Sequence, residues 1–164
     1  HRRLRHYTLA TGSHLAPDDA MLALRGLRTL TVRLPAHDRG ARQVAGWLAG
    51  QSAVRRLLHP AWDSCPGHRL FERDFRGGNG LFGLILQVGD EAGLGRFIDA
   101  LQLFGIGYSW GGFESLCLPM DLTRTQPSVE VGAGEALLRL HIGLEDPADL
   151  IADLAAGFAA LAAG

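Results

Sequence analysis

The sequence predicts an α+β fold: a small mixed or antiparallel sheet of about four strands, with helices packed mainly on one face. Two observations predict this class. Apolar runs of strand length alternate with segments whose apolar residues recur at helical spacing, and the order is two helices followed by β–β–α–β–β–α. No linker or internal repeat divides the chain, so residues 1–164 are expected to form one domain.

The first part of the chain is expected to be helical. Residues 1–10 have no capping residue before their charged run, which indicates the end of a helix rather than its start. Pro17 and the acidic residues after it open a second helix, whose apolar spacing continues over 20–34. Pro35 is expected to kink or interrupt this helix because proline lacks the backbone N–H. A further helix is expected over 36–50.

Four apolar runs predict the strands. The clearest is 81–88, a continuous apolar run between two glycines, which is typical of a central strand buried on both faces. The other strands are expected at 53–59, 113–118 and 137–144. Between the first two strands lies a long excursion rich in Pro, Gly and Asp, 60–80, with one helical turn expected around 67–73.

Two amphipathic segments predict the helices that cover the sheet. Residues 90–104 carry an apolar stripe, and Gly105 is expected to end that helix. Asp146 and the proline after it are expected to cap a final helix that extends to about residue 163. The polar, Gly- and Pro-bearing residues 120–135 predict a loop.

Composition and charge argue against several classes of function. A net charge of −1 gives no basic excess with which to displace counterions from phosphates, so no nucleic-acid partner is expected. The longest apolar runs are too short to span a bilayer, and no apolar signal-peptide core follows the basic N-terminus. We therefore expect no membrane partner and a cytoplasmic location. Cys65 and Cys117 lie far apart without metal-ligand spacing, so we expect reduced thiols and no metal site.

Residues 105–119 are the most unusual stretch. Four glycines, a Tyr, a Ser and a Trp fall within eight residues, and glycine at this density indicates backbone at positive φ or backbone lying close to another group. Tyr108, Ser109 and Trp110 are therefore candidates for ligand binding; the alternative is a tight turn with a core tryptophan. Residues 107–111 match the Gly-x-Ser-x-Gly pattern of hydrolases. That motif needs a strand before it and a helix after it, and the order here is reversed.

Arg139 is the sharpest candidate for ligand binding. It sits in an otherwise apolar strand, where burying an unpaired charge is costly. It is expected either to form an internal salt bridge to Glu114 or Glu145, or to clamp a ligand carboxylate through its planar guanidinium. His141 lies two residues further on, hence on the same face of the strand, and is expected to be a hydrogen-bonded residue rather than a base.

These motifs together resemble one known family. Three segments carry the likeness: Tyr-Ser-Trp-Gly-Gly-Phe-Glu-Ser-Leu at 108–116, Leu-Arg-Leu-His-Ile-Gly-Leu-Glu-Asp at 138–146, and Ala-Asp-Leu-Ile-Ala-Asp-Leu at 148–154. They are similar to the C-terminal domain of the pyridoxal-phosphate (PLP) enzymes of Cys/Met metabolism, of fold type I. The likeness covers essentially all 164 residues. Trp110, where γ-type members typically carry Leu, favours the β-lyase side, that of the bacterial cystathionine β-lyases.

The resemblance implies a PLP-dependent carbon–sulfur lyase acting on an amino-acid thioether such as cystathionine. By the matching motifs, Arg139 would hold the substrate α-carboxylate, with Ser109, Tyr108 and Trp110 lining the same site. No catalytic residue is implied in this chain, because all 16 of its basic residues are Arg and the family uses a lysine to bind PLP covalently.

The chain is therefore expected to be the C-terminal domain of a longer enzyme whose PLP-binding large domain is absent here. Alone it is expected neither to catalyse the reaction nor to bind PLP covalently. Without the large domain, the apolar faces of helices 20–34 and 36–50 are expected to be partly uncovered, which favours self-association; family members are homo-oligomers. The alternative, from a different class, is a stand-alone non-catalytic domain that binds small amino acids or a partner surface.

Overall fold

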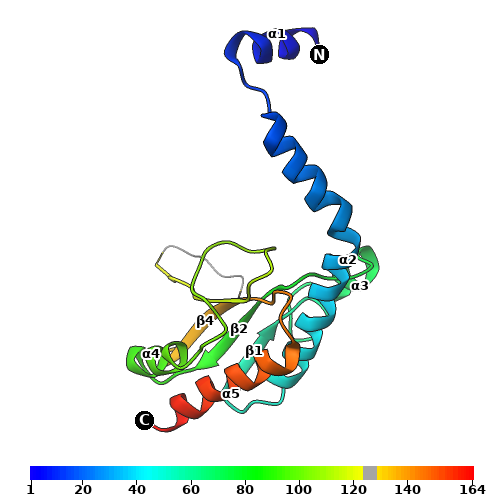
Figure 1. The fold of residues 1–164 in the computed structure, drawn as a ribbon. Helices are drawn as coiled ribbons and strands as arrows, with labels where there is room; N and C mark the ends of the chain where they lie inside the picture. The colour runs from blue at the N-terminus through cyan, green and yellow to red at the C-terminus, as the bar shows by residue number, and fades with distance from the viewer. Residues whose placement is uncertain (124–128) are drawn as a thin grey trace. The chain divides into compact units, whose positions relative to one another are not determined.

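The computed structural model describes residues 1–123 and 129–164, so the loop expected at 120–135 lies partly outside the described residues. The described chain divides into two compact units, His1–Arg33 and Leu34–Gly164. Its elements, in chain order, are α1 (Arg2–Thr11), α2 (Pro17–Leu48), β1 (Val54–Leu58), α3 (His68–Asp74), β2 (Leu81–Gln87), α4 (Glu91–Asp99), β3 (Leu116–Pro119), β4 (Glu135–His141) and α5 (Pro147–Ala162) (Figure 1).

The first unit contains α1 and the beginning of α2. Helix α1 confirms the helix expected at 1–10, and the residue after it, Gly12, has a φ of 67°, which suits the left-handed cap position. Helix α2 begins at Pro17, as predicted. The large apolar side chains of this unit are exposed: Leu4, Tyr7, Leu9, Leu15, Met21, Leu22, Leu24, Leu27, Leu30 and Val32. The expectation that the 20–34 face would be uncovered is confirmed.

Pro35 lies inside one continuous helix, so the expected division into two helices is wrong. The second part of α2 is fixed by packing, because Ala41, Val44, Ala45 and Leu48 are completely buried in the main core. That burial offsets the hydrogen bond lost at Pro35. It also means that the apolar face of 36–50 is covered within this unit, and the expectation that it would be exposed is wrong.

The second unit is built on a four-stranded sheet in the order β1-β2-β4-β3. Each neighbouring pair is antiparallel, so the sheet predicted as mixed or antiparallel is antiparallel. The central pair runs in register from Leu81 opposite His141 to Gln87 opposite Glu135. Strand β2 confirms the central strand predicted at 81–88, and the helical turn expected around 67–73 is present as α3.

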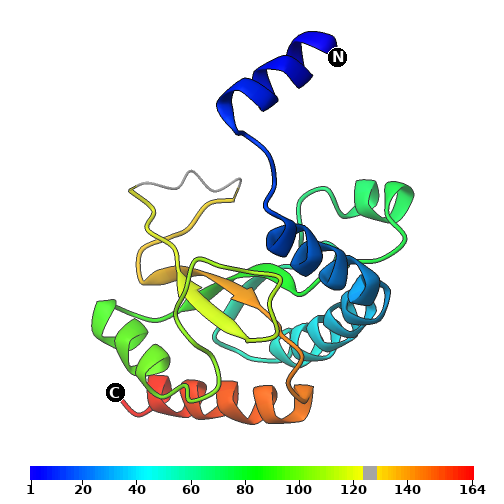
Figure 2. The same cartoon turned by 45° about the horizontal axis from the view of Figure 1, so that its top comes forward.

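Helices α4 and α5 and the second part of α2 cover one face of this sheet (Figures 1 and 2). Because side chains alternate along a strand, Ala136, Leu138 and Leu140 of β4 enter the core beneath these helices. Leu137 belongs instead to a small second cluster on the opposite face, with Ile85. Helices mainly on one face were predicted, and the structure confirms them.

The helix predicted over 90–104 ends five residues early, at Asp99. The reason is a buried carboxylate on α5. Asp153 accepts hydrogen bonds from the backbone N–H groups of Gln102 (2.8 Å), Leu103 (2.9 Å) and Phe104 (3.2 Å). These donors are satisfied by a side chain some fifty residues away instead of by the preceding helical turn.

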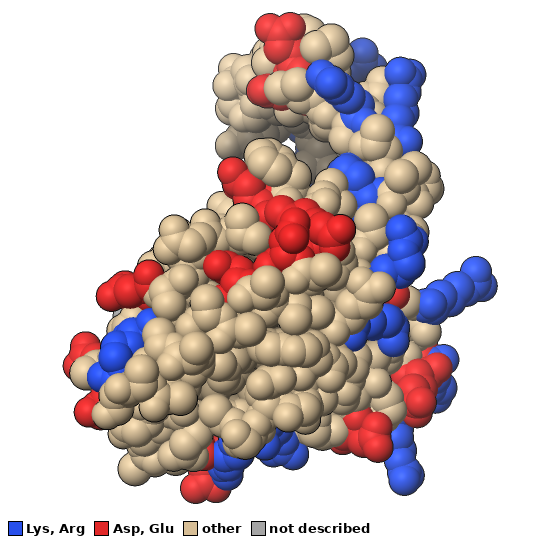
Figure 3. All heavy atoms as spheres, turned by 60° about the horizontal axis from the view of Figure 1, so that its bottom comes forward, with Lys and Arg blue, Asp and Glu red and all other residues tan. Residues whose placement is uncertain are grey.

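Figure 3 shows a broad uncharged area on the lower part of the face in view, with a group of Asp and Glu side chains above it and further charged side chains around its margin. The last charged residue of α5 is Asp153, which is buried, and the exposed positions that follow are alanines. None of the helices in the described part of the chain is long and apolar enough to cross a membrane.

His59, at the end of β1, makes the stability of this unit depend on pH. The ring is buried (1% exposed) against Trp62 and Phe82, and its Nδ1 accepts the N–H of Ala61. Burial, with a smaller contribution from the charge of Arg42, lowers the pKa of His59 from 6.5 to about 4.

The free energy of unfolding is expected to fall as the pH drops from 6.5 toward 4, by on the order of 1–3 kcal/mol, because in this range the unfolded chain binds a proton that folded His59 does not. His59→Asn keeps an acceptor near Ala61 but does not titrate, so it should reduce the slope. His14→Asn, at an exposed histidine, is the control. Urea unfolding at several pH values measures the slope, and equal slopes in all three proteins would contradict the assignment.

Candidate functional site

Strand β4 places Arg139 on the sheet face that the helices do not cover. Its neighbours in register are Gly83 on β2 and Leu118 on β3. Gly83 has no side chain, so nothing from β2 covers the guanidinium at that position, and Arg139 is half-buried rather than enclosed. The location predicted for Arg139, mid-strand in an apolar segment, is confirmed.

Arg139 bonds to backbone oxygens rather than to an acid. Its Nη2 donates to the carbonyl oxygens of Gly107 (3.1 Å) and Tyr108 (2.8 Å). The internal salt bridge to Glu114 or Glu145 is wrong: among the described residues, no carboxylate pairs with Arg139. Within the same part of the chain, Nε and Nη1 have no hydrogen-bond partner. The site therefore presents a cation whose charge is not neutralised by those residues.

The carbonyls that Arg139 binds belong to residues 105–112, the Gly-rich turn. Gly105 pairs with the next strand, donating to the Ser115 carbonyl and accepting from the N–H of Cys117. Gly111 has a φ of 84°, where a side chain would be strained. The sequence predicted positive φ or close approach for this stretch without assigning either to a particular glycine; Gly111 shows the first, and Gly105 shows the second, against the next strand rather than a ligand.

The side chains of the turn point outward. Tyr108 is 78% exposed and Trp110 is 62% exposed, so the alternative of a core tryptophan is wrong. Ser109 is also exposed, and its hydroxyl has no hydrogen bond to another described residue. The turn follows α4 and precedes β3, which confirms the helix-then-strand order that argues against a hydrolase nucleophile.

His141 holds the far end of the turn. Its Nε2 lies 3.1 Å from the N atom of Gly111 and 3.2 Å from the O atom of Gly112. The residue is 3% exposed, and burial is the main cause that lowers its pKa below 6.5; the charge of Arg139 acts in the same direction, while the Gly112 carbonyl opposes it. The expected hydrogen-bonding role is confirmed for Nε2, while Nδ1 is buried without a partner among the described residues.

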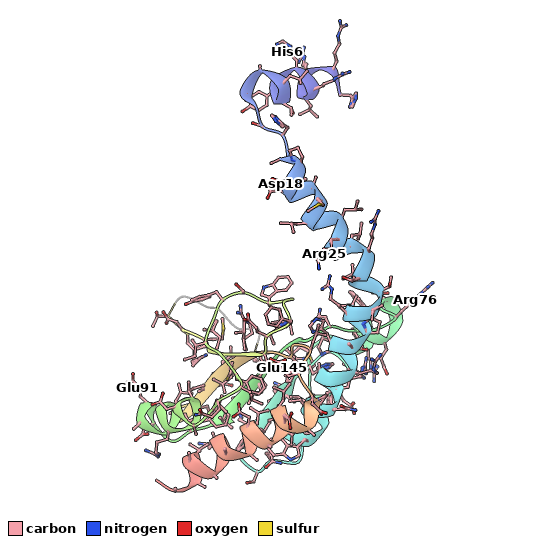
Figure 4. All side chains as sticks on the ribbon, in the orientation of Figure 1. His6, Asp18, Arg25, Arg76, Glu91 and Glu145 are labelled. Carbon is pink, nitrogen blue, oxygen red and sulfur yellow. The ribbon has the colours of Figure 1, made fainter. Side chains whose placement is uncertain are left out.

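A second network fixes the chain on either side of the site, and sequence reasoning missed it. Glu145, in the connection between β4 and α5 (Figure 4), accepts from the Ser115 N–H (2.7 Å) and from its hydroxyl (2.8 Å). The same hydroxyl oxygen accepts from the N–H of Gly143 (2.9 Å). These side-chain bonds lie just beyond the last β3–β4 pair, Leu116 opposite His141, and one backbone bond, from the Leu144 N–H to the Phe113 carbonyl, continues past them. The strands predicted at 113–118 and 137–144 are observed at 116–119 and 135–141. The residue that could have revealed this network from the sequence is Gly143, since a glycine at a strand end indicates close backbone approach.

The remaining candidates form no site. Cys117 is buried in the core, as expected, and burial raises the pKa of its thiol to about 12, so it is unreactive. Both cysteines are free thiols. Outside residues 124–128, no three His, Cys, Asp or Glu side chains are placed to hold a metal ion.

Comparison with known proteins identifies the family. The model of the family of Cys/Met metabolism PLP-dependent enzymes matches residues 1–159, and the chain belongs to this family. The cystathionine beta-lyase of Bordetella avium is 50% identical over 157 residues, which are 94% of this chain and 39% of that protein. The L-alanine/L-glutamate racemase of Wolbachia pipientis wMel is 40% identical over 160 residues, 96% of this chain and 38% of that one.

A solved structure shares the fold. The crystal structure of cystathionine gamma synthase from Xanthomonas oryzae pv. oryzae, in complex with aminoacrylate and cysteine, matches with a TM-score of 0.83 and 36% identity. The match covers 99% of this chain and 43% of that one. The chain therefore spans about two fifths of the length of the relatives it matches.

The residues present do not fit covalent attachment of the family's cofactor. PLP forms an imine with a lysine amine in enzymes of this kind, and these 164 residues contain no lysine. What they do contain is a guanidinium without an acidic partner among the described residues, beside a turn with exposed hydroxyls. This donor set suits an anionic ligand group and not the cofactor's covalent anchor.

Substitution of Gly143 by Ala should destabilise the second unit by roughly 2 kcal/mol or more. An added Cβ would stand 2.1 Å from the carbonyl oxygen of Phe113, so the backbone must shift and the Ser115–Glu145 network with it. Gly95→Ala is the matched control, because its Cβ meets nothing within 4 Å in helix α4 and should stabilise by about 0.5–1 kcal/mol. Urea unfolding compares the two; a neutral effect at Gly143 would contradict the close approach.

Proposed function

We propose that this chain supplies the substrate-carboxylate site of a longer PLP-dependent carbon–sulfur lyase of the cystathionine β-lyase type. In this proposal residues 1–164 are its C-terminal domain, and the rest of the polypeptide provides the PLP-binding domain with the lysine. Two facts support it: the 50% identity to a cystathionine beta-lyase, and a match that spans only 39% of that relative.

The observation that carries the proposal is the hydrogen bonding of Arg139. A guanidinium has five N–H donors, and two of them, on Nη2, go to Gly107 and Tyr108. A two-point grip on a carboxylate uses two adjacent nitrogens, so the substrate α-carboxylate would bind Nε or Nη1, which have no partner among the described residues, and would compete with a turn carbonyl for one Nη2 proton. Ser109, Tyr108 and Trp110 would line the same site, with the Ser109 hydroxyl as a further donor.

Binding of a substrate α-carboxylate is a role that every relative named here could use. The residues of this chain do not determine which bond of the substrate is broken in the reaction. The racemase is 40% identical over nearly the same chain, and the names of these relatives refer to amino acids, each of which has an α-carboxylate. PLP, when bound, supplies the electron sink for the chemistry. The residues of this chain bind and orient the substrate. We assign an amino-acid thioether as substrate because the β-lyase has the higher identity.

Arg139→Gln is expected to raise KM for L-cystathionine roughly 10- to 100-fold in the PLP-loaded enzyme, with a smaller effect on kcat, because the carboxylate is gripped before and during the reaction. Arg55→Gln is the matched control: Arg55 lies on β1 and pairs with Glu135. It should leave KM unchanged. Steady-state kinetics measures both, and a normal KM in Arg139→Gln would overturn the proposed carboxylate role.

A second candidate is a stand-alone, non-catalytic domain that binds amino acids or a partner surface. The observation that favours it is the absence of lysine from these 164 residues. The two candidates predict polypeptides of different length.

We also propose that the protein self-associates, since the first unit exposes many large apolar side chains. A cytoplasmic location stays a prediction.

Mass spectrometry of the protein isolated from its source cells tests the polypeptide length and the assembly together. Under denaturing conditions the lyase proposal predicts a chain more than twice the 17.6 kDa of these residues. Under native conditions self-association predicts a mass of two or more such chains. A denatured mass of 17.6 kDa would instead support the non-catalytic domain, and a native mass of one chain would contradict self-association.

A further inference from the structure

The Gly-rich turn is attached to β4 at two points. Arg139 holds its first half through the carbonyls of Gly107 and Tyr108, and His141 holds its second half through Gly111 and Gly112. Only Ser109 and Trp110 lie between the two attachments. Each residue spans only a short length of backbone. The hydrogen bonds that fix Tyr108 and Gly111 therefore also restrict the backbone of the two residues between them.

We infer that His141 is a positioning residue: it anchors the second half of the Gly-rich turn and thereby sets where Ser109 and Trp110 stand beside Arg139. The anchoring itself is independent of the proposed function; only the expected effect of the anchoring on substrate binding rests on that function. Whichever tautomer is present, Nε2 is the atom that faces the turn, either accepting from the N–H of Gly111 or donating to the carbonyl of Gly112.

The His141 ring is itself held in place from behind. His37 of α2 lies with its ring 5.4 Å from that of His141, and its Nδ1 is 2.8 Å from the carbonyl oxygen of Ile142. Gly80 gives the ring its room, because a Cβ there would come within 3.1 Å of His141 Nδ1 and 2.2 Å of the Ile142 oxygen. Nδ1 of His141 is buried without a partner among the described residues. Among the described residues, Nε2 is therefore the only ring nitrogen of His141 that makes a hydrogen bond.

Two variants of His141 separate a positioning role from packing alone. Gln places an amide, with both a donor and an acceptor, near the position of Nε2, whereas Leu keeps bulk but cannot hydrogen-bond. His59→Leu is the matched control, since His59 is an equally buried histidine that contacts Ala61, Trp62 and Phe82 instead of the turn. It should lower overall stability without loosening the turn selectively.

The first readout is amide hydrogen exchange by NMR in the full chain without ligand. The geometry allows the Gly111 N–H to donate to Nε2, and with that tautomer His141→Leu should speed exchange at Gly111 roughly 3- to 10-fold relative to amides of β2 and β4, as expected for the loss of one hydrogen bond. His141→Gln should stay near the wild-type rate. Wild-type exchange at Gly111 in His141→Leu, or equal loosening in the Gln, Leu and His59→Leu proteins, would overturn the inference.

The second readout is KM for L-cystathionine in the PLP-loaded enzyme. His141→Leu should raise KM several-fold, and Gln should restore it, because the Ser109 hydroxyl stands correctly only when the turn is anchored. If exchange responds as expected and KM does not, His141 anchors the turn, and it is the proposed substrate role of this face that fails. If KM rises equally in the Leu and Gln variants, the positioning role fails.

Discussion

The antiparallel pairing of β4 with a strand on each side is the constraint on which the rest of the second unit depends. Side chains alternate along a strand, so burying Leu138 and Leu140 beneath the helices commits Arg139 to the opposite face. A slip of one residue would exchange the two faces and place the guanidinium in the core. Because β4 pairs with both β2 and β3, such a slip would break pairing on both sides.

The turn above that face has little regular structure, and side chains from elsewhere in the fold fix it. Arg139 and His141 bind the turn from β4. Glu145 binds Ser115, the residue between the turn and the start of β3. Groups fixed before a ligand arrives cost less to order on binding. This explains how an exposed side chain such as that of Trp110 can be held in place on a loop, as the proposed substrate site requires.

The sequence predicts the parts of this fold that depend on local periodicity and fails where a distant group decides. The strands and the final helix follow from their apolar spacing. Helix α4 stops early because of Asp153, some fifty residues further along the chain, and no local pattern marks that contact. Arg139 was found because it breaks an apolar pattern. Its partners were missed because they are backbone carbonyls, which every residue has, and the sequence favours no one of them.

The most direct test of the carboxylate role of Arg139 is a crystal structure of the PLP-loaded protein with an unreactive amino-acid inhibitor. The proposed carboxylate role predicts an inhibitor carboxylate oxygen about 2.7–2.9 Å from Nε or Nη1 of Arg139, with at least one of the two Nη2 bonds to the turn carbonyls lengthened. An inhibitor whose carboxylate lies elsewhere, with both turn carbonyls still bound to Nη2, would contradict it. Arg139 would then be a structural clamp for the turn and not the substrate anchor.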